Sequence, residues 1–404
     1  MTALAATFFL RQRGPLLVAA ALLALAPRAA DAAGSPSAQA REVGTLTVDE
    51  LDELAALAGL SQTSWQSSLE TKLGVGWDSN LLLSNVTRVA SGFSRARVEG
   101  LLWRPARAAQ PWELVAFLNA DYRKMFSAQE LPHDTQAFGQ AEARWRPVPA
   151  LRLSLLAQGY YLDSVLDLST ESERLSTPLR NSGSIAGTAA RWDLGARTWI
   201  EAQASINRSD FFQIPEDFRE RRLGVLAGWQ SADGTLKLGA GARQRDRRYR
   251  ERTLTTLGGR PLAGTQLRYR APELELTAER TAAWHGTWRF AGAVSGARND
   301  DNGSGYFNYR LGRALATLGW TRAPWEVEAS LGTSRYRWDA QVAGIGLDPP
   351  LRRRTDDTLT LQVNRRLNER WFVFTELERE WVWSNDPTAG YTLTMCSLGL
   401  GAKL

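Results

Sequence analysis

The residue types that most often carry out catalysis are scarce in this sequence. It contains one cysteine, Cys396, and two histidines, His133 and His285, which are too few for a disulfide framework or a His/Cys metal cluster. His133 precedes Asp134, and a histidine beside a carboxylate at an exposed rim can act as a general base in hydrolysis. His285 falls in a different connection, so the two histidines cannot cooperate. Without a phosphate-binding loop or a nucleophile elbow, we expect neither an enzyme nor a bound cofactor or metal.

Charged residues are the other candidates, because arginine and glutamate recur at alternate positions in many stretches of the chain. In 112–123, apolar residues at even positions alternate with Glu113, Asn119, Asp121 and Arg123. Such a series can line a water-filled channel from one face of a strand. The candidate lumen-lining residues are Arg97, Arg123, Arg144, Arg222, Arg243, Arg245, Glu326, Glu328, Arg366, Glu376 and Glu378.

The signs of these charges follow a pattern of their own. Acidic and basic residues are interspersed, which predicts that most of them pair with one another across the lumen. Basic residues also crowd the range 218–250, whereas Glu376, Glu378 and Glu380 share one late segment. If these two segments lie on facing walls, they would set a transverse electric field across a constriction.

The elements that must position these residues are β-strands. Strict alternation over ten or more residues places apolar side chains on one face and polar ones on the other, whereas a helix would scatter them around its circumference. Sixteen segments show the pattern: 66–77, 92–103, 112–126, 135–145, 151–163, 182–192, 198–208, 218–229, 235–245, 265–279, 287–298, 305–320, 325–338, 355–367, 371–383 and 390–404.

The connections between these segments alternate in length. Every second one is short, such as 146–150 and 321–324, and the others are mostly longer, such as 78–91 and 339–354. This predicts an all-β fold, a transmembrane up-and-down antiparallel β-barrel of about sixteen strands, with periplasmic turns and extracellular loops. The strand number becomes eighteen if 164–181 or 246–264 contains an additional hairpin. Sixteen strands leave a water-filled channel.

Tryptophan placement supports a membrane location. Of the 16 Trp residues, twelve fall near the short connections, including the pairs Trp103 with Trp112 and Trp320 with Trp325. Amphipathic rings gathered at one level are typical of a membrane–water interface. We therefore expect a multi-pass protein of a Gram-negative outer membrane, with the outer-membrane lipid and the barrel assembly machinery as partners. The net charge of +6 is too small and too scattered for nucleic acid to be a partner.

The N-terminal residues are typical of a signal peptide followed by a short periplasmic segment. Arg11 and Arg13 precede the apolar stretch 16–26, and Ala30-Asp31-Ala32 follows it, which predicts a signal peptide over 1–32. Residues 33–64 are then a periplasmic lead that contains a short helix over 47–59, because Thr47 and Glu50 have capping-box spacing. The barrel occupies 65–404. Its last strand alternates to the final residue, as an outer-membrane insertion signal does.

The end of the first predicted strand carries a family resemblance. The sequence GVGWDSNLLL, Gly74–Leu83, is similar to the G-[YW]-D-S-N pattern of several bacterial outer-membrane barrels. These include exopolysaccharide-export channels and, behind a helical repeat domain, surface lipoprotein assembly modifiers. The resemblance implies that Asp78, Ser79 and Asn80 turn the chain into the first outer loop. The helical repeat domain is absent here.

The leading functional hypothesis is a channel that exports a hydrophilic extracellular polysaccharide through a charged, water-filled lumen. Export would require a periplasmic polysaccharide co-polymerase and the secreted polysaccharide as partners. The first alternative is a general or anion-preferring diffusion porin, and the second is a surface lipoprotein assembly factor or adhesin. These alternatives are not separated by the residues alone.

Overall fold

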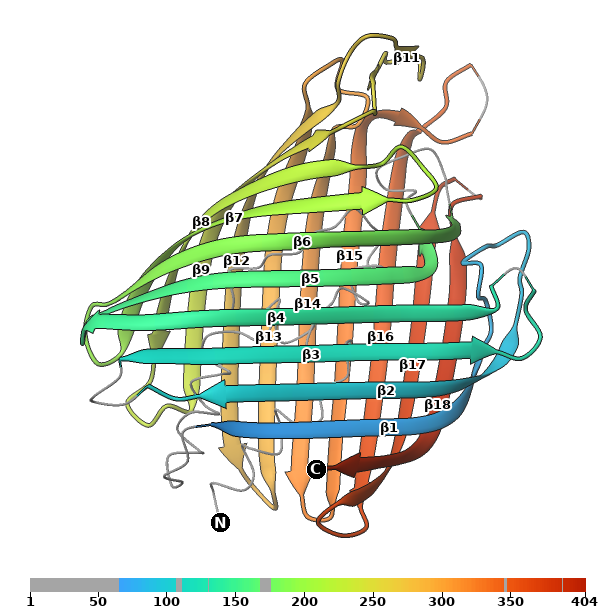
Figure 1. Ribbon diagram of the computed structural model, residues 1–404. Coiled ribbons are helices and arrows are strands. Elements are labelled where there is room, and N and C mark those ends of the chain that lie inside the picture. Colours follow the sequence, from blue (N-terminus) through green and yellow to red (C-terminus); the bar gives the residue numbers. More distant parts are fainter. Residues whose placement is uncertain (1–64, 107–110, 130, 168–175, 345–346, 387) are drawn as a thin grey trace.

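The computed structural model describes residues 65–404 except 107–110, 130, 168–175, 345–346 and 387. Sixteen strands form a closed barrel in which each strand pairs antiparallel with its neighbour. Figure 1 shows the strands of the near wall crossing those of the far wall, because strands in a closed barrel tilt relative to its axis. Within the described residues, no helix has the length and apolar character needed to cross a membrane.

The barrel strands are β1 (Gln66–Asp78), β2 (Ser91–Arg104), β3 (Trp112–Met125), β4 (His133–Val148), β5 (Leu151–Asp167), β6 (Ser176–Asp193), β7 (Thr198–Phe211), β8 (Phe218–Gln230), β9 (Leu236–Tyr249), β12 (Arg268–Ala283), β13 (Thr287–Asp301), β14 (Tyr309–Arg322), β15 (Trp325–Val342), β16 (Leu351–Arg366), β17 (Trp371–Ser384) and β18 (Tyr391–Lys403). The short strands β10 (Leu254–Thr255) and β11 (Pro261–Leu262) pair outside the barrel.

The topology confirms the predicted up-and-down barrel. The strands follow chain order around the ring, and β1 closes it by pairing with β18 from Glu70↔Lys403 to Asp78↔Met395. The described residues of the two long connections add no barrel strand: 246–264 contributes the separate β10–β11 hairpin, and the described part of 164–181 lengthens β5 and β6. The predicted signal peptide over 1–32 and the helix over 47–59 lie outside the described residues.

In the middle of the wall, apolar side chains point outward and polar ones inward. Leu276 and Val294 are 64% and 59% exposed on the exterior, whereas Lys72 and Arg97 are 3% and 2% exposed on the interior. We call this part, between the two ends of the wall, the barrel body. Its arrangement reverses that of a water-soluble protein, because the surroundings of the exterior are hydrocarbon and the interior must be polar.

The tryptophans near the short turns mostly face outward. Trp112 and Trp145 stack with ring centroids 5.6 Å apart on neighbouring strands, and Trp288 lies 6.1 Å from Trp320. Two tryptophans of this predicted band, Trp103 and Trp199, face inward, as does Trp338 at the opposite end of the wall. Trp103 and Trp338 point inward and are 3% and 2% exposed, and the Trp199 ring lies inside the wall against Gly228. Alternation decides the face of each tryptophan, and nearness to a turn does not.

Glycines allow aromatic rings to lie flat against the inner wall where the barrel closes. A Cβ atom added to Gly401 would stand 2.0 Å from the Phe372 ring, and one added to Gly76 would stand 2.4 Å from the Phe93 ring. Only a residue without a side chain permits this approach. These glycines of β1 and β18 therefore allow close packing where the two strands close the barrel.

The short turns are closed by local hydrogen bonds. Between β8 and β9, the Asp233 carboxylate accepts hydrogen bonds from the hydroxyl groups of Ser231 and Thr235. These bonds favour the ionised form and lower the pKa of Asp233 to about 2. Between β12 and β13, Gly286 adopts a φ of 132° next to His285 at 46°, a conformation that glycine tolerates best.

At the end with the longer loops, the two faces exchange residue types. The inward side chains there form three apolar clusters, which together we call the outer collar. They are Leu81, Leu83, Phe93, Met125, Ala128, Leu131, Val165, Val382, Tyr391, Leu393 and Met395; Leu179, Phe211, Phe218, Tyr249, Leu267, Tyr269 and Phe307; and Tyr309, Leu311, Tyr336 and Trp338. Outward side chains at this level are largely arginine and aspartate. The strands therefore extend beyond several predicted ends, for example to Val342 in β15.

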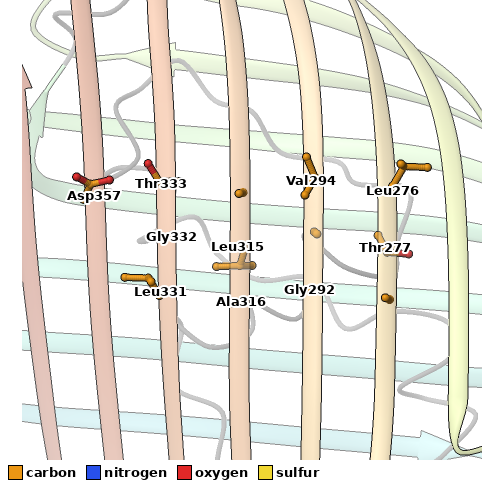
Figure 2. Close-up of a pocket in the computed structure, with 13 residues that line it drawn as sticks. Leu276, Thr277, Gly292, Val294, Leu315, Ala316, Leu331, Gly332, Thr333 and Asp357 are labelled. Carbon is orange, nitrogen blue, oxygen red and sulfur yellow. The ribbon is translucent and has the colours of Figure 1, made fainter.

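A shallow depression marks the exterior of the wall formed by β12 to β16. Its volume is about 460 Å³. Figure 2 shows Leu276, Val294 and Leu331 around Gly292 and Ala316. Glycine and alanine at these positions leave room for the depression. The depression lies on the apolar outer surface and is separate from the lumen. Together with the outward tryptophans, this surface identifies a multi-pass outer-membrane barrel.

Candidate functional site: the barrel lumen

The candidate site is the lumen, because all eleven charged residues singled out in the sequence take inward positions on their strands. Arg97, Arg123, Arg144, Arg222, Glu326 and Glu378 are each less than 9% exposed. Arg243, Arg245, Glu328, Arg366 and Glu376 are partly exposed. Buried charges require partners, since an isolated charge away from water costs several kcal/mol. Their contacts therefore define how the lumen is organised.

Glu376 on β17 is the centre of the largest ion-pair network. Its carboxylate lies 3.3 Å from the Lys72 ammonium of β1 and 3.9 Å from the Arg97 guanidinium of β2, and it also accepts a hydrogen bond from Arg95. Arg95 binds Asp121 of β3 through a second pair. These contacts link four inward strand faces across the closure between β1 and β18.

Ion pairs continue from this network toward both ends of β3 and β4. Toward the outer end, Arg123 binds Asp134 at 2.8 Å, and Ser164 donates to the same carboxylate at 3.0 Å. Toward the periplasmic end, Arg144 lies 2.8 Å from Glu142 and 3.4 Å from Glu113. The polar surface is thus continuous along this wall, and each charge on it is balanced locally.

The basic residues of β8 and β9 are also neutralised by near neighbours. Arg222 and Arg247 both bind Glu220, at 2.5 Å and 2.7 Å, and Arg243 binds Glu275 on β12. In strand order, β8 and β17 lie in opposite halves of the ring. The contacts of Arg222, Arg243 and Arg247 given above are with carboxylates on their own or adjacent strands, rather than with the glutamates of β17. The transverse field is reduced accordingly.

The acidic wall formed by β15 and β17 is less completely paired. Glu326 lies 4.0 Å from Arg366. Glu378 is 2% exposed, and neither of its carboxylate oxygens has a hydrogen-bond partner among the described atoms. It faces the inside of the wall at the level where β17 pairs with Thr360 of β16. Glu378 is therefore a buried carboxylate on the lumen face without a hydrogen-bond partner among the described residues.

Near the outer end, one ion pair joins opposite sides of the barrel. Arg354 on β16 binds Asp167 on β5 at 2.8 Å and Asp356 on its own strand at 2.5 Å. Six strands lie between β5 and β16 along one side of the ring, and eight along the other. The β5 end must therefore bend inward over the lumen to make this contact.

Strand pairing explains how the β5–β6 hairpin can bend. Pairing of β5 with β4 stops at Asp163, and pairing of β6 with β7 stops at Asn181, whereas β5 and β6 continue to pair with each other up to Asp167↔Ser176. Beyond those positions the described residues of the hairpin form ladder pairs only with each other, and the last lateral backbone bond runs from the Phe212 amide to the Arg180 carbonyl at 3.0 Å. We call residues 164–167 and 176–180 the inward hairpin.

The inward hairpin is also held by apolar contacts. Val165 is 2% exposed and belongs to the cluster that includes Val382, Leu393 and Met395 from β17 and β18. The lumen is therefore narrowed at its outer end by an ion pair and by a packed apolar contact. Sequence reasoning missed this constriction, because Asp167 and Arg354 fall in ranges that it assigned to loops.

The outer collar adds aromatic surfaces to the lumen. Phe218, Tyr249 and Tyr269 form a continuous row, with ring centroids 5.8 Å and 5.4 Å apart. Arginines stack on the collar: Arg247 lies 4.1 Å from the Phe218 ring, and Arg352 lies 4.4 Å from the Trp338 ring. Aromatic faces and guanidinium groups can contact planar or hydroxylated solutes.

The sequence neighbours His133 and Asp134 lie on opposite faces of β4. Asp134 points inward to Arg123, whereas His133 stands 3.3 Å from Asp163 on the exterior. Adjacent strand residues point to opposite faces, so a catalytic pair of these two residues does not form. Cys396 also faces outward. Within the described part of the chain, no three His, Cys, Asp or Glu residues are grouped to hold a metal.

The segment 74–83 ends β1 in the way that the sequence predicted. Asp78 accepts a hydrogen bond from the Asn80 amide at 2.9 Å, and the Asn80 side chain donates to the Thr392 carbonyl at 3.0 Å. The Ser79 hydroxyl accepts from the Thr394 amide at 2.8 Å. These bonds fasten the first outer loop to β18 and complete the barrel closure.

Comparison with known proteins gave similarities of structure alone, since neither the family models nor the curated proteins match the sequence. The outer membrane protein OpdK from Pseudomonas aeruginosa has a TM-score of 0.44 and 9% identity, over 84% of this chain and 99% of that chain. OccAB1 of Acinetobacter baumannii has a TM-score of 0.46 and 8% identity, over 84% and 97%. A bacterial polysaccharide outer membrane secretin has a TM-score of 0.41 and 11% identity, over 85% and 99%. Similarity at this level assigns no function.

Proposed function

We propose that this protein is an outer-membrane channel through which small hydrophilic solutes diffuse. The observation that supports the proposal most directly is the continuous, locally neutralised polar surface inside the barrel body, from Glu70 near the periplasmic end to Asp134 near the outer end. Such a surface suits water and polar solutes without retaining ions of one sign. We further propose that the eleven inward charged residues form the path.

The proposed channel is narrow rather than wide. Most inward side chains of the body are buried by one another, and the inward hairpin spans the lumen near its outer end. Conductance is limited by the narrowest section of a pore. We therefore expect the Asp167–Arg354 contact to control conductance more than any ion pair in the body.

Single-channel recording in planar bilayers tests the proposal. Asp167→Asn removes the cross-lumen partner and leaves the Arg354–Asp356 pair intact, so we expect conductance to rise by about twofold as the constriction widens. Asp163→Asn is the matched control: it lies on the same strand but pairs with Arg180 at 3.0 Å on the exterior. It should conduct like the unaltered protein.

Two outcomes would contradict the proposal. Absence of current from both the unaltered protein and Asp167→Asn would exclude a diffusion channel. Equal conductance of the two proteins would keep the channel but remove the inward hairpin as its constriction. Folding of each variant is checked by heat-dependent migration in gels, which distinguishes folded barrels from unfolded chains.

Export of an extracellular polysaccharide is the second candidate, favoured by the aromatic rows of the outer collar. Aromatic faces stack on sugars, and dispersed polar groups let a chain slide. A strain without the protein should lose surface polymer while the polymerised precursor is still made with its periplasmic co-polymerase. Normal surface polymer in that strain would exclude export and leave diffusion as the function.

A further inference from the structure

The exterior of the outer end carries rows of arginine that are set directly opposite one another on adjacent strands. In the first row, Arg208 of β7 faces Arg219 of β8, which faces Arg248 of β9, which faces Arg268 of β12. All four side chains are exposed. Like charges directly opposite in a sheet are destabilising, so four in succession require an explanation.

A second row continues on the next four strands of the ring. Arg298 of β13 faces Arg310 of β14, which faces Arg337 of β15, which faces Arg353 of β16. These side chains are also exposed. We call the two rows together the arginine belt. It extends over eight neighbouring strands, from β7 to β16.

The protein supplies acidic partners to only part of the belt. Arg208, Arg298 and Arg310 lie 2.9 Å, 2.8 Å and 3.9 Å from Asp210, Asp300 and Asp339. Among the described residues, the side chains of Arg219, Arg248, Arg268, Arg337 and Arg353 make no ion pair. The belt therefore keeps a substantial excess of positive charge that faces away from the barrel.

The belt lies at a defined height on the wall. Ten residues separate Arg219 from Trp229 on β8, Trp288 from Arg298 on β13, and Arg310 from Trp320 on β14. Ten strand residues tilted by about 40° rise by roughly 25 Å, which matches the height of the apolar band of an outer-membrane barrel. The tryptophans mark one edge of the hydrocarbon, so the arginines mark the other.

The remaining wall provides an internal contrast. On β18, β1 and β2 the outward residues near the outer end are uncharged, and they include Trp77, which pairs with Gly92. The directly opposed rows of arginine therefore occur on one side of the barrel, whereas the remaining wall has single outward basic residues such as Lys124 of β3. Direct opposition of four successive arginines in each row indicates a specific contact rather than a general solubilising surface.

We propose that the arginine belt binds the phosphate groups of the glycolipid of the outer leaflet, lipopolysaccharide. Guanidinium groups bind phosphate through two parallel hydrogen bonds, and a row of anions between neighbouring arginines removes their mutual repulsion. The apolar wall directly below the belt contacts the acyl chains of the same molecule. The proposal does not depend on what passes through the lumen.

Native mass spectrometry and lipid titration of the purified full-length protein test the proposal, with bisphosphorylated lipid A and dephosphorylated lipid A as probes. In the test variant, Arg219, Arg248, Arg337 and Arg353 are replaced by Gln, which leaves no aspartate without its partner. We expect its affinity for bisphosphorylated lipid A to fall at least about tenfold. Dephosphorylated lipid A should bind the unaltered protein and the variant equally weakly.

The matched control replaces the outward arginines of the periplasmic end, Arg280, Arg322 and Arg365, by Gln, and it should bind bisphosphorylated lipid A as the unaltered protein does. Equal binding by the belt variant, or equal binding of the two lipids, would overturn the proposal. If the fourfold variant does not fold, the double variants Arg219→Gln/Arg248→Gln and Arg337→Gln/Arg353→Gln test each row. Inorganic phosphate alone, added at the lipid concentration, should not compete.

Discussion

The barrel body and the outer collar are built from the same strands, yet they place residue types on opposite faces. On β13, Val294 faces outward in the body and Arg298 faces outward four residues later. On β15, Glu328 faces inward in the body and Trp338 faces inward beyond it. The alternation of side chains continues from Val294 to Arg298 and from Glu328 to Trp338.

This exchange follows from the surroundings of the wall. Hydrocarbon surrounds the body, so apolar side chains are stable outside and charges must be paired inside. Beyond the membrane, water surrounds the wall, and the same strands enclose an apolar core as a soluble β-protein does. The same continuous sheet is thus surrounded by hydrocarbon in the body and by water at the outer end. Four substitutions test this account.

Removal of the central carboxylate should damage the body most. Glu376→Ala leaves Lys72, Arg95 and Arg97 together without their shared anion, and breaking a buried ion pair in this way costs about 3–5 kcal/mol. Urea unfolding in micelles, followed by circular dichroism, measures the free energy of unfolding. A loss below 1 kcal/mol would show that water already solvates these charges.

Removal of a collar ring should resemble a core substitution in a soluble protein. Trp338 stacks with Tyr336 at 5.7 Å and with Arg352, so Trp338→Ala should lower the free energy of unfolding by about 3–5 kcal/mol. The matched control is Trp383→Ala, since that ring is 63% exposed on the exterior. Equal losses in both variants would contradict a packed apolar collar.

A charge placed on the exterior of the body tests the membrane boundary. Val294→Arg puts a guanidinium near the middle of the apolar band, which costs about 2–4 kcal/mol in a membrane barrel. The reverse exchange on the exterior of the outer end, Arg298→Val, should leave the unfolding free energy in bilayers nearly unchanged. If the two exchanges have equal effects, the hydrocarbon does not end between these positions.

The smallest effect is expected for an ion pair on the exterior of the wall at the level of the outer collar. Asp300→Ala breaks the exposed contact with Arg298, and exposed pairs contribute about 0–1 kcal/mol. The same unfolding measurement, made at two salt concentrations, should show a small difference that disappears at high salt. A loss as large as that of Glu376→Ala would mean that both ion pairs occupy equally dry surroundings.

Much of this fold was predictable from single residues and their spacing. The sixteen segments correspond one to one with the barrel strands, because a period of two survives in each of them and the connections alternate in length. The eleven candidate residues take inward positions for the same reason. His133 and Asp134 show the limit of the approach: the sequence placed both in an outer loop, whereas they begin β4 and point to opposite faces of it.

Strand ends were less predictable than strand centres. Residues such as Trp338 and Arg353 reverse the pattern of the body, so the range 339–354 reads as a loop when one face is assumed to be apolar throughout. The one sequence feature that could have predicted the longer strands is the set of aromatic residues at inward positions of β9, β12 and β15. They indicate that the strands continue with the apolar face turned inward.

The number of strands, the two faces of the wall and its place in a membrane were predictable from the order of the residues. These properties depend on contacts between residues that are near one another along the chain or on adjacent strands. Which charged residues form ion pairs depends on the tertiary structure. Closure of the ring brings Glu376 to Lys72 and Arg95, and the bend of β5 brings Asp167 to Arg354. The contact between Lys72 and Glu376 joins residues 304 positions apart, and it forms only when the barrel has closed.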